Sequence, residues 1–107
     1  MMELVAVVQI CPEPEWYRLE FAERCCLRGE IGALLAACEN VKCRWYDAEP
    51  WTGSIAEFVV CEFSTLQAYW GLWNELREAT VFRKSYARIG HVSLGYERPL
   101  SIGLVDT

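Results

Sequence analysis

The sequence predicts a single α+β domain whose strands and helices follow in the order β-α-β-β-α-β. Its length of 107 residues is close to the commonest domain size, so we expect one domain over residues 1–107. Four segments are rich in β-branched and aromatic residues, and two others repeat apolar residues at helical spacing. Hydrophobic residues make up 53% of the chain, which supplies a core and leaves apolar surface for a ligand or a partner.

The first strand is predicted over residues 3–10. One face carries Leu4, Ala6, Val8 and Ile10, and the other carries Val5 and Val7. Because both faces are apolar, the pattern favours a central strand that is covered on both sides. Prolines at positions 12 and 14 end this strand, and a short helical turn is expected over residues 16–19.

A longer helix is predicted over residues 20–38, where apolar residues recur at helical spacing. Gly29 and Gly32 weaken its middle by about 1 kcal/mol each relative to alanine. They also allow close packing onto the sheet. Asn40 is a residue type that commonly ends helices.

The second and third strands are predicted over residues 41–47 and 55–63, and the short loop between them indicates an antiparallel hairpin. In the second strand Arg44 and Tyr46 share one face. The other face of that strand carries Cys43, Trp45 and Asp47. The third strand carries Phe58, Val60 and Glu62 on one face and Glu57, Val59, Cys61 and Phe63 on the other.

A second helix is predicted from Ser64, as the N-cap residue, to about residue 79. Gln67 completes a capping box with Ser64. Its apolar stripe consists of Leu66, Tyr69, Trp73 and Leu76. The sequence leaves two interpretations open, because such a stripe either fills a core or forms the wall of an aromatic cavity.

The fourth strand is predicted over residues 86–96, after a connector that carries Phe82. Strict alternation places Tyr86, Arg88, Gly90, Val92 and Leu94 on one face and Ala87, Ile89, His91 and Ser93 on the other. From about residue 98 the chain is an irregular apolar tail, which we expect to pack on a neighbour or over a pocket mouth.

This element order is the ferredoxin-like topology, with a four-stranded antiparallel sheet and two helices on one face. The second face of such a sheet is bare in a single copy, yet the predicted strands are apolar on both faces. We therefore expect a homodimer in which a second copy covers that face.

The acidic balance, a net charge of -5, argues against nucleic acid as a partner, because phosphates attract the opposite charge. No apolar run is long enough to span a membrane, and residues 1–3 lack the basic start of a signal peptide, so we expect a cytoplasmic protein. The six cysteines have no paired spacing for a metal and fit small buried hydrophobes. We expect no metal and no cofactor.

The stretch Arg44-Trp45-Tyr46-Asp47-Ala48-Glu49 resembles a pattern of the darcynin family of small bacterial proteins. Further matches to that family are Glu57, Glu62, Tyr69, Trp73, Leu76, Arg77, Phe82 and Tyr86, with weaker ones at Trp16, Leu19, Glu23 and Arg24. The resemblance covers roughly residues 12–97. The chain departs from the family pattern at Glu78-Ala79-Thr80 and in its cysteine-rich first helix.

The resemblance implies the architecture of the dimeric α+β barrel proteins. That superfamily includes cofactor-independent monooxygenases of aromatic polyketides, polyketide cyclases, isomerases and haem enzymes. Its cavity usually lies between the sheet and the helices. Fold-level likeness of this kind does not by itself establish a reaction.

Candidate catalytic residues are few. His91 is the only imidazole, and its ordinary pKa suits a general base near neutrality, although a lone histidine is more often structural. Asp47 ends the second strand and is a second candidate base. Arg44 and Tyr46 share a face and are candidates to stabilise an oxyanion, unless Arg44 forms a structural ion pair with Glu62.

Candidate substrate-binding residues are Tyr69, Trp73, Trp51, Glu62, Tyr86 and Arg88. Tyr69 and Trp73 offer stacking surface for a planar ligand, and Trp51 lies in a loop that can close over it. The first functional hypothesis is an enzyme acting on a hydrophobic, aromatic or polycyclic small molecule: a cyclase, isomerase or cofactor-free monooxygenase that transfers a proton at an enolisable carbon. The alternative is a non-catalytic dimeric ligand-binding or accessory protein. A haem enzyme with His91 as axial ligand is the third hypothesis.

Overall fold

The computed structural model describes residues 4–47 and 57–98, and these form the predicted α+β fold. The strands are β1 (Leu4–Pro12), β2 (Val41–Asp47), β3 (Glu57–Phe63) and β4 (Ala87–Tyr96). The helices are α1 (Pro14–Tyr17), α2 (Phe21–Ala37), α3 (Leu66–Leu76) and α4 (Thr80–Arg83). Predictions for Trp51 and for the tail from residue 99 fall outside the described residues.

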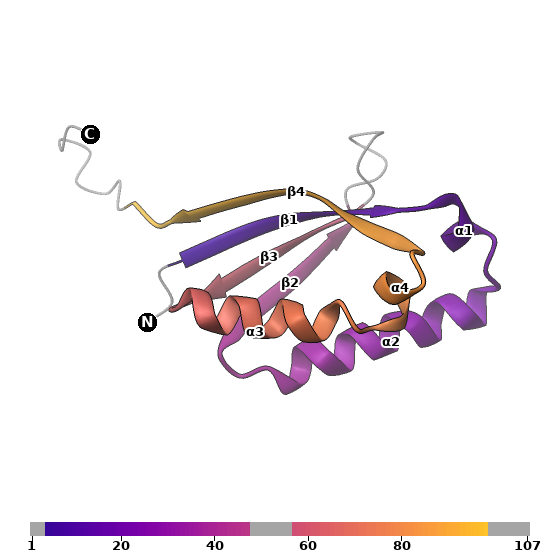
Figure 1. Cartoon of the computed structure of the whole chain (residues 1–107), viewed down its shortest axis with the longest axis horizontal. Helices are drawn as coiled ribbons and strands as arrows, with labels where there is room; N and C mark the ends of the chain where they lie inside the picture. Colours follow the sequence, from indigo (N-terminus) through magenta and orange to yellow (C-terminus); the bar gives the residue numbers. More distant parts are fainter. Residues whose placement is uncertain (1–3, 48–56, 99–107) are drawn as a thin grey trace.

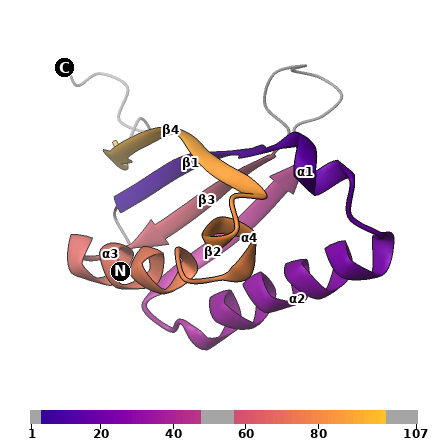
Figure 2. The same ribbon diagram turned by 45° about the vertical axis from the view of Figure 1, so that its right-hand side comes forward.

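The four strands form one antiparallel sheet in the order β2-β3-β1-β4. The two long helices α2 and α3 lie on the same side of this sheet, and the short helix α4 lies between α2 and the start of β4 (Figures 1 and 2). The ferredoxin-like prediction is therefore confirmed. On the other side of the sheet, which we call the open face, no helix lies among residues 4–47 and 57–98.

The core lies between the sheet and the helices. Its fully buried strand residues come from alternate positions, namely Ala6, Val8 and Ile10 in β1 and Val59, Cys61 and Phe63 in β3. The helices contribute Ile31, Tyr69, Leu72, Trp73 and Leu76. Alternation along each strand therefore decides which side chains reach the helices, as the sequence predicts for the first three strands.

The fourth strand departs from the predicted alternation. Ile89 pairs with Ile10, but Val92 pairs with Val8, so two residues of β4 stand opposite the single residue Gln9. This β-bulge reverses the alternation, and residues beyond it that were predicted on the two faces exchange places. Val92 joins the helix-facing side of the sheet, opposite Val8.

The bulge has a local cause at Gly90. A Cβ atom at this position would lie 2.9 Å from Sγ of Cys11, closer than ordinary contact. The neighbouring His91 N–H donates to Oε1 of Gln9 at 3.3 Å, which satisfies a donor that the bulge removes from the regular ladder. Glycine and a side-chain amide therefore accommodate the extra residue.

Both long helices begin at capped positions. At α2 the capping box pairs Glu20 with Glu23, whose Oε1 accepts from the Glu20 N–H. At α3 the N-cap is Thr65, and its Oγ1 accepts from the Ala68 N–H at 3.2 Å. The prediction of Ser64 as N-cap is wrong by one residue, because the residue after it supplies the bond. The connector that carries Phe82 forms the short helix α4.

Replacing Thr65 with alanine tests the cap of α3. We expect the free energy of unfolding to fall by about 1 kcal/mol, because the Ala68 N–H loses its acceptor. Urea unfolding followed by circular dichroism measures the change. Gln67→Ala is the matched control in the same turn, and an equal loss in both variants would contradict the assignment.

Candidate functional site

A cavity of about 430 Å³ lies between α2 and the helix-facing side of the sheet. It is lined by Ile10, Pro12, Trp16, Leu27, Arg28, Ile31, Gly32, Leu35, Trp45, Asp47, Glu57, Val81, Phe82 and Ala87. The lining is mostly apolar, and its charged members are one arginine and two carboxylates. A largely apolar pocket with a few converging polar groups is typical of small-molecule sites.

Glu57 is the centre of the polar network in this cavity. Its Oε1 accepts a hydrogen bond from Nε1 of Trp45, on the neighbouring strand β2. Its Oε2 lies 3.7 Å from Nη2 of Arg28, on α2. The Glu57 side chain is only 18% exposed, against 58% for Arg28. A carboxylate this sheltered is therefore stabilised by two partners from two elements.

Asp47 stands directly opposite Glu57 in the antiparallel register of β2 and β3. Residues opposite one another on one face of such a pair have neighbouring side chains. Asp47 is exposed, whereas Glu57 is half-buried and hydrogen-bonded. The cavity thus has a more sheltered carboxylate and a more exposed one at its rim, and the exposed one is the better placed to meet a ligand.

The aromatic wall of the cavity comes from separate elements. Trp16, on α1, is buried, and the Arg28 guanidinium carbon lies 5.3 Å from the centre of its ring, a cation–π contact. Phe82, on α4, packs edge-on against Trp73 with ring centres 6.2 Å apart. The α4 backbone is held in turn by Glu30 of α2, whose Oε2 accepts from the Thr80 N–H at 3.2 Å.

Tyr69 and Trp73 lie in the core beside the cavity rather than in its lining. The Tyr69 ring stacks on Phe63 at 4.8 Å and meets Trp73 edge-on at 6.4 Å. Of the two interpretations of this stripe, the structure supports the one in which it fills the core.

Burial raises the pKa of the Tyr69 phenol, a nearby Cys61 acts in the same direction, and Arg77 opposes both.

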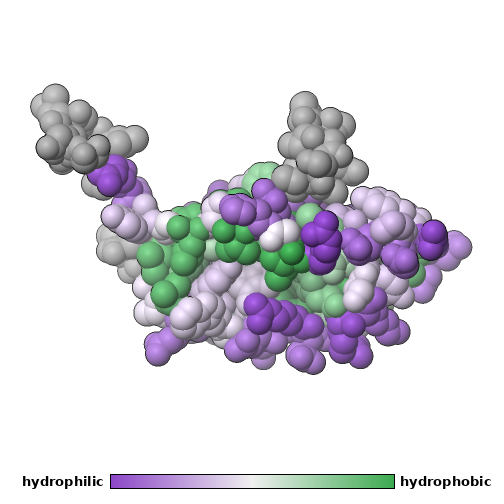
Figure 3. Space-filling view, turned by 45° about the horizontal axis from the view of Figure 1, so that its top comes forward, coloured by the Kyte–Doolittle hydropathy of each residue, from purple (hydrophilic) through white to green (hydrophobic). Residues whose placement is uncertain are grey.

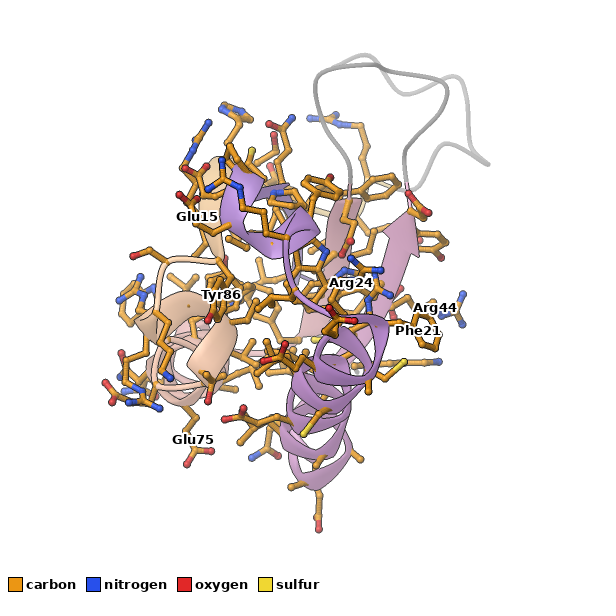
Figure 4. All side chains as sticks on the ribbon, turned by 90° about the vertical axis from the view of Figure 1, so that its right-hand side faces the viewer. Glu15, Phe21, Arg24, Arg44, Glu75 and Tyr86 are labelled. Carbon is orange, nitrogen blue, oxygen red and sulfur yellow. The ribbon has the colours of Figure 1, made fainter. Side chains whose placement is uncertain are left out.

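Arg44, Tyr46 and Glu62 lie on the open face of the sheet, away from the cavity. Tyr46 is the register partner of Phe58 and stacks on it at 5.1 Å, while Lys42 stands opposite Glu62. Figure 4 shows the Arg44 guanidinium at the outer edge of the molecule. The structure therefore separates Arg44 and Tyr46 from Asp47, with which they were grouped as catalytic candidates.

The candidates from the last strand are also outside the cavity. His91 is exposed and lies at the bulge. The Arg88 Nε donates to Oε1 of Glu13 at 3.2 Å, and both residues line a second, shallower hollow with Arg77. Tyr86 is half-buried against the core. Asp47 is thus the one predicted site residue that the described structure places in the cavity.

Sequence reasoning missed Arg28, Trp16 and Glu57 as members of one site. The alternation of the second strand already placed Trp45 and Asp47 on one face, and Glu57 follows from pairing that strand with the third. Helical spacing left open whether Leu27 or Arg28 lies on the apolar stripe of α2, so the pattern did not identify Arg28 as a cavity residue. Both residues line the cavity.

Among residues 4–47 and 57–98, no group of three or more histidine, cysteine or acidic side chains is placed to hold a metal ion. In that same part of the chain, no helix has the length and apolar character that crossing a membrane requires.

The chain is similar in fold to chlorite dismutases. Two mutant structures of the chlorite dismutase from Candidatus Nitrospira defluvii give TM-scores of 0.83 and 0.82, each at 23% identity. These alignments cover 95% and 94% of this chain but 43% of each chlorite dismutase. A further structure, described as a chlorite dismutase candidate, gives a TM-score of 0.75 at 17% identity over 89% of this chain and 45% of its own.

At these identities the likeness establishes the ferredoxin-like fold alone. The chain spans less than half the length of the chlorite dismutases that it matches. No protein-family model and no curated protein matches the sequence. The resemblance to the darcynin family therefore stays a prediction.

The buried phenol of Tyr69 predicts a loss of stability in alkali. Its pKa is raised in the folded state above the usual value of about 10, so the folded state favours the neutral phenol. The neutral phenol therefore adds to the free energy of unfolding, in full at pH values below the pKa of Tyr69 in the unfolded chain. This addition is lost as the pH rises through the raised pKa of Tyr69 in the folded chain. Between those values we expect the free energy of unfolding to fall more steeply in the wild-type chain than in Tyr69→Phe.

Chemical unfolding from pH 8 to pH 12 measures this difference, with Tyr46→Phe as the control on the open face. Equal slopes for the wild-type chain and Tyr69→Phe would contradict the assignment of the buried phenol.

Proposed function

We propose that the chain is an enzyme that binds a hydrophobic, planar small molecule in the α2 cavity and transfers a proton at an enolisable carbon of it. The observation that carries this proposal is the meeting of Asp47, Glu57 and Arg28 inside one cavity walled by indole and phenyl rings. The volume of about 430 Å³ suits a molecule of two or three fused rings.

The two carboxylates take different roles in this proposal. Asp47, at the rim, removes the proton as general base, because it is the more exposed of the two carboxylates. Glu57 holds Arg28 in place as a positioning residue. The Arg28 guanidinium stabilises the negative charge that develops on the substrate oxygen, as an oxyanion partner does. Trp16 and Phe82 provide surfaces for the ring system.

The roles first predicted for His91, Arg44 and Tyr46 are not part of this proposal, because those residues lie outside the cavity. The names of the fold neighbours raise a second possibility, activity on chlorite, and the superfamily of the resemblance includes haem enzymes. A haem held through histidine does not fit the cavity, since the chain has one histidine and it is exposed on β4.

A second copy of the chain completes the proposal. The open face carries Val5, Val7 and Val60 in half-buried positions without a helix over them. On the helix-facing side beyond the bulge, Val92, Leu94 and Tyr96 of the edge strand β4 are 42%, 52% and 71% exposed. Figure 3 shows hydrophobic residues gathered on one side of the molecule. We propose a cytoplasmic homodimer that covers the open face and the exposed apolar residues of β4.

The non-catalytic binding module is the alternative, and it requires the same cavity. It differs in that no single ionisable residue would be essential. The exposed position of Asp47 favours the enzyme over the binding module. A carboxylate at the rim adds no affinity for a purely apolar ligand.

Deuterium exchange at the α-carbon of an aryl ketone tests the enzyme. The wild-type chain is incubated in D2O with 2-tetralone, and loss of the α-proton signal is followed by NMR. We expect exchange faster than in buffer, and about 10²-fold slower exchange in Asp47→Asn, the usual effect of losing a general base. Glu62→Gln, on the opposite face of the same two strands, is the control and should retain the wild-type rate.

Three outcomes separate the hypotheses. Exchange that depends on Asp47 supports the enzyme. Binding of 2-tetralone that quenches tryptophan fluorescence, without faster exchange, supports the binding module. If neither binding nor exchange is found for a panel of bicyclic aryl ketones, the proposed function is wrong.

The dimer has its own test. Leu94→Asp places a charge on the exposed apolar side of β4, so we expect the molar mass in solution to fall from that of two chains to that of one. Size-exclusion chromatography with light scattering measures it. Phe21→Asp, at an exposed hydrophobic residue on α2, is the control. A wild-type chain that is monomeric at micromolar concentration would contradict the dimer.

A further inference from the structure

Two thiols face each other across β2 and β3, outside the cavity lining. Cys43 and Cys61 are direct register partners, and their Sγ atoms lie 3.4 Å apart. Cys61 is fully buried and Cys43 partly buried. Two sulfurs at this separation are in contact, so small side-chain rotations bring them to the bonding distance of about 2.05 Å.

A third group points to the same sulfur. The Nε1 atom of Trp73 is buried with no hydrogen-bond partner among the described residues. The Trp73 side chain also lowers the pKa of the Cys61 thiol. A buried indole N–H without an oxygen acceptor is costly, and a sulfur that carries negative charge would satisfy it. Cys61 thus receives the S–H of Cys43 and faces the N–H of Trp73.

These contacts make the two thiols unequal. The hydrogen bond from Cys43 lowers the pKa of the Cys61 thiol, burial opposes it, and Trp73 adds to the lowering. The same hydrogen bond, together with burial, raises the pKa of Cys43. The two thiols therefore titrate as one coupled pair, in which the hydrogen bond from Cys43 favours the thiolate of Cys61. An attacking thiolate beside a protonated resolving thiol is the arrangement of redox-active cysteines.

We propose that Cys43 and Cys61 form a redox-active pair that closes to a cross-strand disulfide when the chain meets a hydroperoxide. This site is independent of the proposed function. Of the four other cysteines, Cys25 and Cys26 are exposed on α2, and Cys11 and Cys38 are partly buried, as Cys43 is.

The reaction with hydrogen peroxide has two steps. The Cys61 thiolate attacks one oxygen, an S–O bond forms, the O–O bond breaks, and the leaving hydroxide takes up the proton that Cys61 released. The Cys43 sulfur then attacks the Cys61 sulfur, an S–S bond forms, the S–O bond breaks, and hydroxide leaves as water with the Cys43 proton. Two thiols lose two electrons in total, and one peroxide becomes two waters.

The disulfide would act on the edge of the sheet. Among the described strands, β2 lies at the edge of the sheet and pairs with β3 alone. Trp45 of β2 lines the cavity two residues from Cys43. A covalent bond at Cys43 fixes this strand on its neighbour. Strand β2 can then no longer separate from β3 at that point.

Peptide mapping after peroxide treatment tests the pair. The folded wild-type chain is treated with hydrogen peroxide, alkylated, digested and examined by mass spectrometry. We expect a cross-linked peptide that contains Cys43 and Cys61, a chain mass lower by two hydrogen atoms, and full reversal by dithiothreitol. The Cys25→Ala/Cys26→Ala chain should form the same cross-link, and Cys43→Ala should leave Cys61 as a sulfenic acid that dimedone traps.

Two results would overturn the proposal. One is that Cys43 and Cys61 stay reduced at peroxide concentrations that oxidise the exposed Cys25 and Cys26. The other is that Cys61 proceeds to sulfinic acid in the wild-type chain without a cross-link. Neither result depends on a variant that must fold, because both are read from the wild-type chain.

Discussion

The register of β2 on β3 is the constraint on which the rest of this structure depends. It sets Asp47 opposite Glu57 at one end of the pair and Cys43 opposite Cys61 in the middle. A slip of one residue would turn Trp45 and Asp47 to the open face and remove them from the cavity. The indole of Trp45 supports this register, because its Nε1 donates to Glu57 across the two strands.

The buried aromatic rings serve the cavity indirectly. Tyr69 and Trp73 pack on Phe63 and Phe82, so they fix α3 and α4 on the sheet. Phe82 and its neighbour Val81 then form part of the cavity wall. The N-cap residue of α4 makes no side-chain hydrogen bond, and the Thr80 N–H at the start of this helix donates instead to Glu30 of α2.

The sheet divides the polar residues into two populations. One faces α2 and consists of Asp47 and Glu57, joined there by Arg28. The other lies on the open face with Arg44, Tyr46 and Glu62, where no helix lies over it. A reaction needs its groups within reach of one substrate, so the two populations cannot act together within one chain.

The sequence by itself determined the element order, the antiparallel hairpin and the faces of the first three strands, because side-chain alternation is a local property of extended backbone. It also placed Asp47 beside Trp45. Only the tertiary structure decided that α2 brings Arg28 to Glu57, since helix rotation depends on packing across the sheet. The bulge at Gly90 likewise appears only when β4 is paired with β1, where the Cys11 side chain occupies the space a larger residue would need.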